Sequence, residues 1–135
     1  MVTIIAGAEP TLAGSTVGYH DATGTAAQFR SPAGVVVDSS GNVYVADASN
    51  HRIRKISSTG RVTTLAGSGT EGYHDATGTE AQFRLPFGVA VDSSGNVYVM
   101  DASNHRIRKI TSTGRVTTLA GSGTCLLYTS PSPRD

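Results

Sequence analysis

Short runs of β-branched and other apolar residues alternate along the chain with polar turns that contain glycine. Runs of four to eight such residues, bounded by Gly, Ser, Asn and Asp, are typical of β-strands. The clearest set lies between residues 33 and 66. We therefore predict four strands of one antiparallel sheet, at 33–37, 43–46, 52–56 and 61–66.

The polarity of these four runs changes in order along the chain. The first two runs are apolar almost throughout, whereas the third and fourth carry Arg, Lys and Thr. A strand that is covered on both faces needs apolar residues on both. The first strand is therefore expected at the centre of the assembly and the fourth at its rim. The short turns Asp38–Asn42 and Ser57–Gly60 predict tight hairpins, so the sheet is an up-and-down meander.

The whole pattern repeats after 54 residues. Residues 18–70 align with 72–124 at 53 positions and differ at only six of them. Val2–Gly7 resembles Val62–Gly67 and begins a partial third copy. The six differing pairs are Ala26/Glu80, Ser31/Leu85, Ala33/Phe87, Val36/Ala90, Ala46/Met100 and Ser57/Thr111.

Four short strands in a repeat of this size are typical of one blade of a β-propeller. The predicted fold class is all-β: two full blades of four antiparallel strands plus an N-terminal outer strand, together an incomplete propeller. The predicted division is an outer strand of a preceding blade at 1–7, a connecting loop at 8–32, the first blade at 33–67, a second connecting loop at 68–86, the second blade at 87–121 and a disordered tail at 122–135.

The blade sequence resembles the NHL-repeat family. The motif runs through Pro32–Asp38, Gly41–Asp47 and Asn50–Ile53, and it recurs from Pro86 to Ile107. The family is named after Asn-His-Leu, and here Arg52 takes the place of the leucine. The resemblance implies a propeller, usually six-bladed, that binds proteins or nucleic acids, with some relatives acting as lyases or other enzymes. Just over two blades are present, so we expect either further blades in a longer chain or self-association of several copies into a closed ring.

The last eleven residues break the repeat. Residues 125–135 read CLLYTSPSPRD and resemble the in-frame translation of an adapter used in DNA sequencing. We therefore expect this segment to be foreign to the natural protein and leave it out of the fold. It holds Cys125, the single cysteine, so disulfide and thiol chemistry are not expected elsewhere.

The charge and the apolar content of the chain restrict the classes of partner that we expect. The formal net charge is +1, which gives no electrostatic case for nucleic acid. No apolar run approaches the roughly 18 residues of a membrane-spanning helix. The expected partner is a protein or a small molecule, with nucleic acid disfavoured and no membrane involved.

Strand parity places the loops at two ends of the sheet. The loop 47–51 and the long loop 67–84 share one end, and the two short hairpins share the other. Long loops on a rigid scaffold commonly carry function, so we predict a binding surface at the first end. The predicted binding residues are Tyr19, His20, Arg30, His51, Arg52, Tyr73, His74, Arg84, His105 and Arg106.

Several residues have a simpler structural interpretation. Short polar side chains at a turn commonly accept backbone N–H bonds, and we expect Asp47, Asn50, Asp101 and Asn104 to hold the loops in this way. Phe29 and Phe83 are expected to anchor the connecting loops. Gly34 and Gly88 are expected to allow close packing near the channel. The basic run Arg52–Lys55 is predicted to be a solvated outer strand whose charge is offset by nearby acidic residues.

Candidate chemistry is sparse. Asp47 and His51 stand four residues apart, but on a turn this spacing defines no common face for a metal. Ser49, His51 and Asp47 recur in both units, whereas an active site is normally built once. The predicted function is a non-enzymatic binding scaffold without metal or cofactor. Two alternatives stay open: a propeller enzyme, such as a metal-dependent lyase or hydrolase whose catalytic residues lie in other blades, and an RNA-binding domain.

Overall fold

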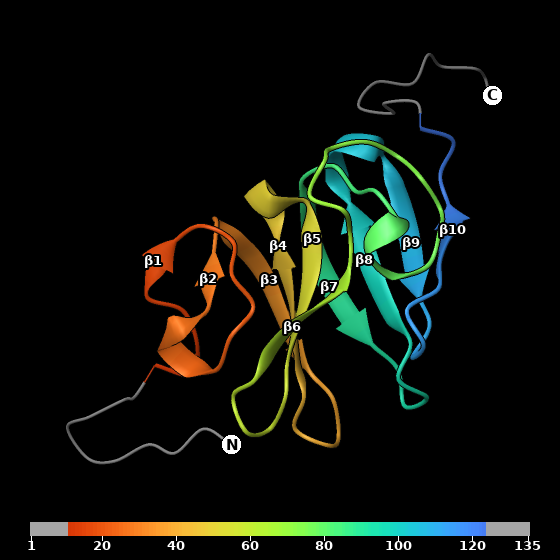
Figure 1. Ribbon diagram of the computed structural model, residues 1–135. Helices are drawn as coiled ribbons and strands as arrows, with labels where there is room; N and C mark the ends of the chain where they lie inside the picture. The colour runs from red at the N-terminus through yellow and green to blue at the C-terminus, as the bar shows by residue number, and fades with distance from the viewer. Residues whose placement is uncertain (1–10, 124–135) are drawn as a thin grey trace.

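Residues 11–123 of the computed structural model form two four-stranded antiparallel sheets that stand side by side (Figure 1). The first sheet contains β3 (Pro32–Val37), β4 (Val43–Asp47), β5 (Arg52–Ile56) and β6 (Val62–Ala66). The second contains β7 (Pro86–Val91), β8 (Val97–Asp101), β9 (Arg106–Ile110) and β10 (Val116–Ala120). The predicted all-β fold with two propeller blades is confirmed.

Each sheet is a meander in which consecutive strands are neighbours. The predicted strand positions hold to within one residue at each end. β3 and β4 pair with a register shift between Pro32 and Gly34, and β5 and β6 shift between Ile53 and Arg54. The second blade repeats both shifts. Register is fixed in both blades because a one-residue slip would turn every buried side chain to the opposite face.

The segments between and before the blades hold more structure than a plain connecting loop. β1 (Thr16–Val17) and β2 (Gln28–Phe29) form a short parallel pair, and η1 (Gly24–Ala26) lies between them. In the second connecting loop, η3 (Gly78–Glu80) occupies the equivalent place. The predicted outer strand at 1–7 and the tail segment 125–135 lie outside the described residues.

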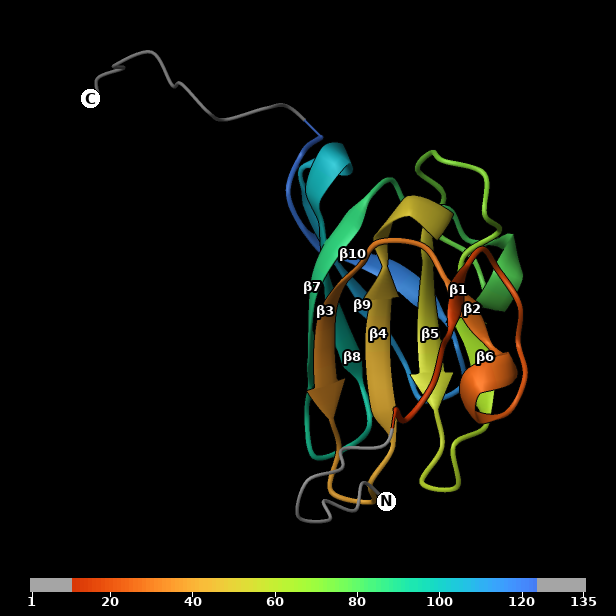
Figure 2. The same ribbon diagram turned by 90° about the vertical axis from the view of Figure 1, so that its left-hand side faces the viewer.

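The main core lies between the two blades. One face of the first blade brings Tyr44, Ala46 and Ile53 against a face of the second that brings Val97 and Val99. Phe83 from the connecting loop is fully buried in the same cluster, as expected for a loop anchor. The two innermost strands, β3 and β7, lie against each other, as Figure 2 shows.

Gly34 accounts for this close approach. A Cβ at Gly34 would lie 2.5 Å from the backbone oxygen of Phe87 and 3.1 Å from the Cα of Gly88. Any side chain would therefore push the inner strands apart. Gly88, at the same position of the second blade, would meet only Met100 side-chain atoms at 3.8 Å. Among the described residues, the predicted packing role therefore holds for Gly34 and not for Gly88.

Candidate functional site

The loops gather at two ends of the blades, as strand parity predicts. η2 (Ala48–Asn50) and η4 (Ala102–Asn104) lie at one end, and the hairpins after β3 and β5 lie at the other (Figures 1 and 2). We call the end that carries η2 and η4 the loop end. It is the end at which the binding surface is predicted.

The long loop between the blades does not stay at the loop end. Its middle runs along the outer strand β10, where Val116 donates its backbone N–H to Ala76 at 2.8 Å. Gly78 then donates to Gly114, in the hairpin at the opposite end, also at 2.8 Å. Only the beginning and the end of this loop can therefore contribute to a surface at the loop end. The expectation that the entire loop lies there is corrected, because backbone pairing with β10 draws its middle away.

The turn after β4 is held by an aspartate and an asparagine. The Asn50 side-chain amide donates to the Asp47 carboxylate at 2.7 Å and to the Gly18 carbonyl at 2.8 Å. Asp47 also accepts the backbone N–H of Arg30 at 2.8 Å. We expected Asp47 to accept an N–H of its own turn. The donor instead belongs to the preceding loop, so this carboxylate ties the loop to the sheet.

Arg54 completes this network from the centre of the sheet. Its side chain is fully buried and donates to Asp47 at 2.6 Å and to Asp21 at 2.8 Å. It also donates to the carbonyls of Gln28 and His20, at 2.8 and 2.9 Å. The prediction of a solvated basic strand is wrong at this position. The side chain points inward because it shares a face of the sheet with Val45, its partner across the strands.

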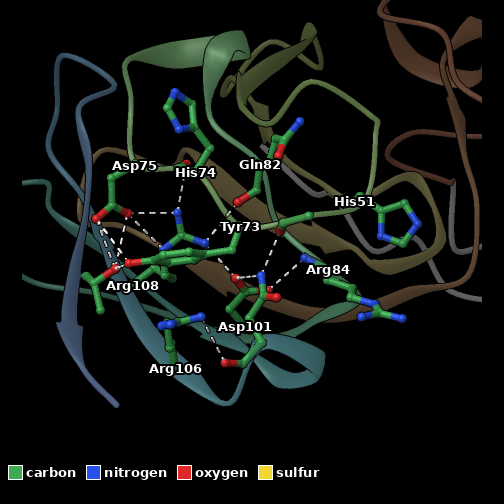
Figure 3. Close-up of polar contacts among 12 residues, drawn as sticks. His51, Tyr73, His74, Asp75, Gln82, Arg84, Asp101, Arg106 and Arg108 are labelled. Atoms are coloured by element: carbon green, nitrogen blue, oxygen red, sulfur yellow. Dashed lines mark hydrogen bonds and ion pairs between the residues drawn. The ribbon is translucent and has the colours of Figure 1, made fainter. Parts of the chain in front are cut away.

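The second blade repeats the network almost atom for atom (Figure 3). Arg108 donates to Asp101 at 2.6 Å and to Asp75 at 2.8 Å. Asn104 donates to the Asp101 carboxylate and to the Gly72 carbonyl. A buried charge that is paired and hydrogen-bonded on every side locks its surroundings in one arrangement. In each blade the network therefore fixes the loop end relative to the sheet.

Tyr19 and Tyr73 cover these networks from outside. The Arg106 guanidinium carbon lies 3.7 Å from the centre of the Tyr73 ring, and that of Arg108 lies 4.7 Å away. The Tyr73 hydroxyl makes a short hydrogen bond with Thr118. Both tyrosines remain 39% exposed, so a ring edge is still available at the surface. Tyr19 has the same arrangement with Arg52, at 3.6 Å.

His51 links the two blades. It adopts the left-handed conformation, with a φ of 53°, and its Nδ1 accepts the backbone N–H of Leu85 at 3.0 Å. Leu85 itself has a φ of 50°. The sequence of one repeat alone cannot predict this hydrogen bond, because its donor and its acceptor belong to different blades.

Seven of the ten predicted binding residues are exposed at the surface, and five of these are arginines or histidines. Arg84 makes an ion pair with Glu71 at 3.3 Å in which both side chains are more than half exposed, so the pair contributes little to stability. The corresponding Arg30 makes no ion pair with any residue that the structure describes. We call this set the loop rim: His20, Arg30, His74, Arg84 and His105.

The opposite end carries a different polar motif. Asp38 accepts the backbone N–H of Asn42 and the hydroxyl of Tyr44, and Asp92 does the same with Asn96 and Tyr98. Hydrogen bonds from the side chain and backbone of Asn96 lower the pKa of Asp92 to about 2. Burial, together with Asp38, raises the pKa of Tyr44 to about 12. These groups close the hairpins, and their pKa values follow from that role.

Residues 11–123 contain neither a cluster of metal-ligating side chains nor a membrane-spanning helix. No three His, Cys, Asp or Glu side chains within this range converge as metal ligands would. No helix in the same part of the chain is long and apolar enough to cross a bilayer.

The sequence of each blade matches a known repeat. The sequence profile of the NHL repeat matches residues 29–56 and 83–110. The chain is 34% identical over 110 residues to Protein SUPPRESSOR OF QUENCHING 1, chloroplastic, from Arabidopsis thaliana, covering 79% of this chain and 10% of that protein. It is 39% identical over 94 residues to NHL repeat-containing protein 2 from Gallus gallus, covering 68% of this chain and 13% of that protein.

Solved structures resemble the same region. A protein from Bacteroides thetaiotaomicron that is provisionally named a phosphatase superposes with a TM-score of 0.64 at 27% identity, covering 79% of this chain and 26% of its own. An auxiliary nutrient binding protein from the same species superposes with a TM-score of 0.63 at 28% identity, covering 79% of this chain and 28% of its own. The chain thus spans roughly a tenth to a quarter of these relatives.

Proposed function

Given that the chain carries two NHL repeats, each folded as one blade of a β-propeller, we propose that it is a non-enzymatic scaffold that binds a partner at the loop rim. The observation that supports this proposal is that the polar side chains at the loop end fall into two sets, one bonded within the fold and one exposed. Asp47 and Asn50 of the turn and Arg54 of β5, with their counterparts in the second blade, make hydrogen bonds and ion pairs that hold the fold. The exposed side chains of the loop rim are arginines and histidines.

The chemistry of the loop rim favours a partner with acidic groups. Arg30 and Arg84 are exposed guanidinium groups that can donate two parallel hydrogen bonds to a carboxylate. The three exposed histidines of the loop rim can also donate a ring N–H to a carboxylate. Exposed tyrosine edges supply apolar contact beside them. An acidic peptide segment of a protein would match these donors.

The test is a binding titration with labelled peptides, followed by fluorescence anisotropy. Acidic peptides are compared with basic peptides of equal length and with single-stranded RNA. The variant carrying Arg30→Ala and Arg84→Ala should bind acidic peptides at least about tenfold more weakly, which corresponds to about 1.4 kcal/mol. These changes leave the backbone N–H groups that Asp47 and Asp101 accept.

A matched control removes two exposed arginines from the hairpins at the opposite end, Arg61→Ala and Arg115→Ala. This variant should bind acidic peptides as the parent chain does. Equal weakening by both variants would mean that net charge, not the loop rim, drives binding. Tighter binding of RNA than of acidic peptides, with strong salt dependence, would favour the RNA-binding alternative instead.

A further inference from the structure

Two large apolar side chains lie exposed where the second blade begins. Leu85 is 41% exposed and Phe87 is 58% exposed, whereas Pro86 between them is buried. They stand at the start of β7, the innermost strand of its sheet, and this start lies at the loop end because Pro86 pairs with Asp101, the residue before η4. We call Leu85 and Phe87 the apolar pair. Exposed apolar side chains that lie together mark a contact with another molecule or segment.

Both blades that meet at this junction belong to the described residues. Phe87 lies on the face of β7 that the first blade covers, since Val89 and Val91, further along the same face, pack into the core between the blades. The backbone oxygen of Phe87 is the atom that a Cβ at Gly34 would meet at 2.5 Å. The Phe87 side chain is therefore exposed beside the contact between the two blades, and not on an uncovered blade face.

The first blade has small residues at the equivalent positions. Ser31 and Ala33 stand where the second blade has Leu85 and Phe87, and these are two of the six differences between the repeats. Ser31 has the same φ of 50° as Leu85, so the backbone follows the same path in both blades. The fold therefore forms with small side chains at both positions, which leaves the two large ones available for a contact outside it.

The residues that flank the apolar pair indicate the chemistry of that contact. Arg84 directly precedes Leu85, and its side chain is 53% exposed in an ion pair with Glu71. His51 of the first blade accepts the backbone N–H of Leu85 at 3.0 Å. An ion pair as exposed as that of Arg84 contributes little to stability, so a carboxylate of a partner can replace Glu71. A ligand held here would thus have a carboxylate and a large apolar side chain next to each other.

We propose that the apolar pair selects, among acidic peptides, those that carry a large apolar residue next to a glutamate or an aspartate. This inference rests on the proposed function of the loop rim and specifies which acidic partner it recognises. The carboxylate of the peptide pairs with Arg84, and its apolar side chain covers Leu85 and Phe87. Burial of about half the surface of a phenylalanine side chain should tighten binding roughly tenfold.

Fluorescence anisotropy titrations of the full chain with two labelled peptides test the proposal. Both peptides contain glutamates spaced by glycines, and one has a central phenylalanine where the other has an alanine. The parent chain should bind the phenylalanine peptide about tenfold more tightly. Rising salt should weaken the binding of both peptides but preserve the ratio of their affinities, because salt screens charges and does not weaken apolar burial.

The variant carrying Leu85→Ser and Phe87→Ala gives the second blade the residues of the first. It keeps the backbone N–H that His51 accepts, so its circular dichroism should match that of the parent chain. It should bind the two peptides equally, with the affinity that the parent chain has for the alanine peptide. Phe87→Ala alone should lose part of the preference for phenylalanine.

Leu119→Ala is the matched control. Leu119 is also 58% exposed, but it lies on β10, the outermost strand of the same sheet. This variant should keep the full preference of the parent chain for the phenylalanine peptide.

The outcomes separate this proposal from the one on which it rests. If the parent chain binds both peptides equally and the variant carrying Arg30→Ala and Arg84→Ala loses both, the selection of apolar residues is wrong and the loop rim remains the binding surface. A preference that survives without Leu85 and Phe87, or that Leu119→Ala also removes, would mean that the apolar residue binds elsewhere. If neither peptide binds the parent chain, both proposals are wrong.

Discussion

The buried Arg54 network permits a quantitative prediction. Arg54→Met keeps an unbranched apolar stem but removes the guanidinium, which leaves the fully buried Asp47 carboxylate without its cation. The carbonyls of Gln28 and His20 lose a donor as well. Removing one partner from a buried ion pair costs about 3–5 kcal/mol. Small domains have only about 5–15 kcal/mol of unfolding free energy, so this one change should remove a large part of the stability.

The assay is urea denaturation followed by far-ultraviolet circular dichroism, since the chain has no tryptophan to report on unfolding. Lys55→Met is the matched control, because Lys55 is the next residue on β5 and is only half-buried. It should change the unfolding free energy by less than about 0.5 kcal/mol. Adding Asp47→Asn to Arg54→Met should recover part of the loss, because it removes the unpaired charge. If Arg54→Met costs no more than Lys55→Met, the network does not hold the loop end and the reasoning fails.

Three further predictions concern the hairpins and the inner strands. The pKa of Asp92 is lowered from 3.8 to about 2, so the contribution of Asp92 to stability is complete above pH 3.8 and is lost as the pH falls through about 2. The melting temperature should therefore fall between these pH values, and Asp92→Asn should make that fall smaller. An unchanged fall would contradict the assignment. The pKa of Tyr44 is raised from 10.0 to about 12, so its contribution is complete below pH 10 and is lost as the pH rises through about 12. An ultraviolet absorbance titration should show a late deprotonation, and Tyr44→Phe should reduce its amplitude but not remove it, because the pKa of Tyr98 is raised as well by its hydrogen bond to Asp92; an unchanged amplitude would contradict the assignment. Gly34→Ala should lower the unfolding free energy by about 1–3 kcal/mol, because its Cβ would lie 2.5 Å from the Phe87 oxygen, whereas Gly88→Ala should be tolerated. Equal losses in urea denaturation would mean that close packing of β3 on β7 is not the reason for the glycine.

The blades could be predicted from sequence because three signals agree. Apolar runs of strand length mark each strand, and a 54-residue repeat shows that the same unit occurs twice. Polarity that increases from the first strand to the fourth orders the strands from centre to rim. All three signals can be found in a single sequence, without an alignment of relatives.

The candidate site was less predictable because it depends on pairings between distant segments. Arg54 was assigned to a solvated strand from the charges around it, although its parity with Val45 places it on an inward face. Its partner Asp21 lies 33 residues earlier, where nothing in the sequence marks the pairing. The path of the long loop is set by hydrogen bonds between its backbone and the backbone of β10 and its hairpin, and such bonds cannot be predicted from side-chain types. The bond from Leu85 to His51 needs the placement of one blade against the next.

The location of Asp21, Asp75 and the two tyrosines outside their sheets has a consequence for how such a gene can grow. The recognisable repeat spans residues 29–56, yet Arg54 is neutralised partly by Asp21, and Tyr19 stacks on Arg52. A duplication that copied only the recognisable motif would yield a blade with a buried cation lacking one of its anions. A duplication of residues 18–71 carries the buried arginine together with both of its aspartates. The segment that must be duplicated is therefore longer than the recognisable motif and begins before it, so that each new blade contains both anions of its buried arginine.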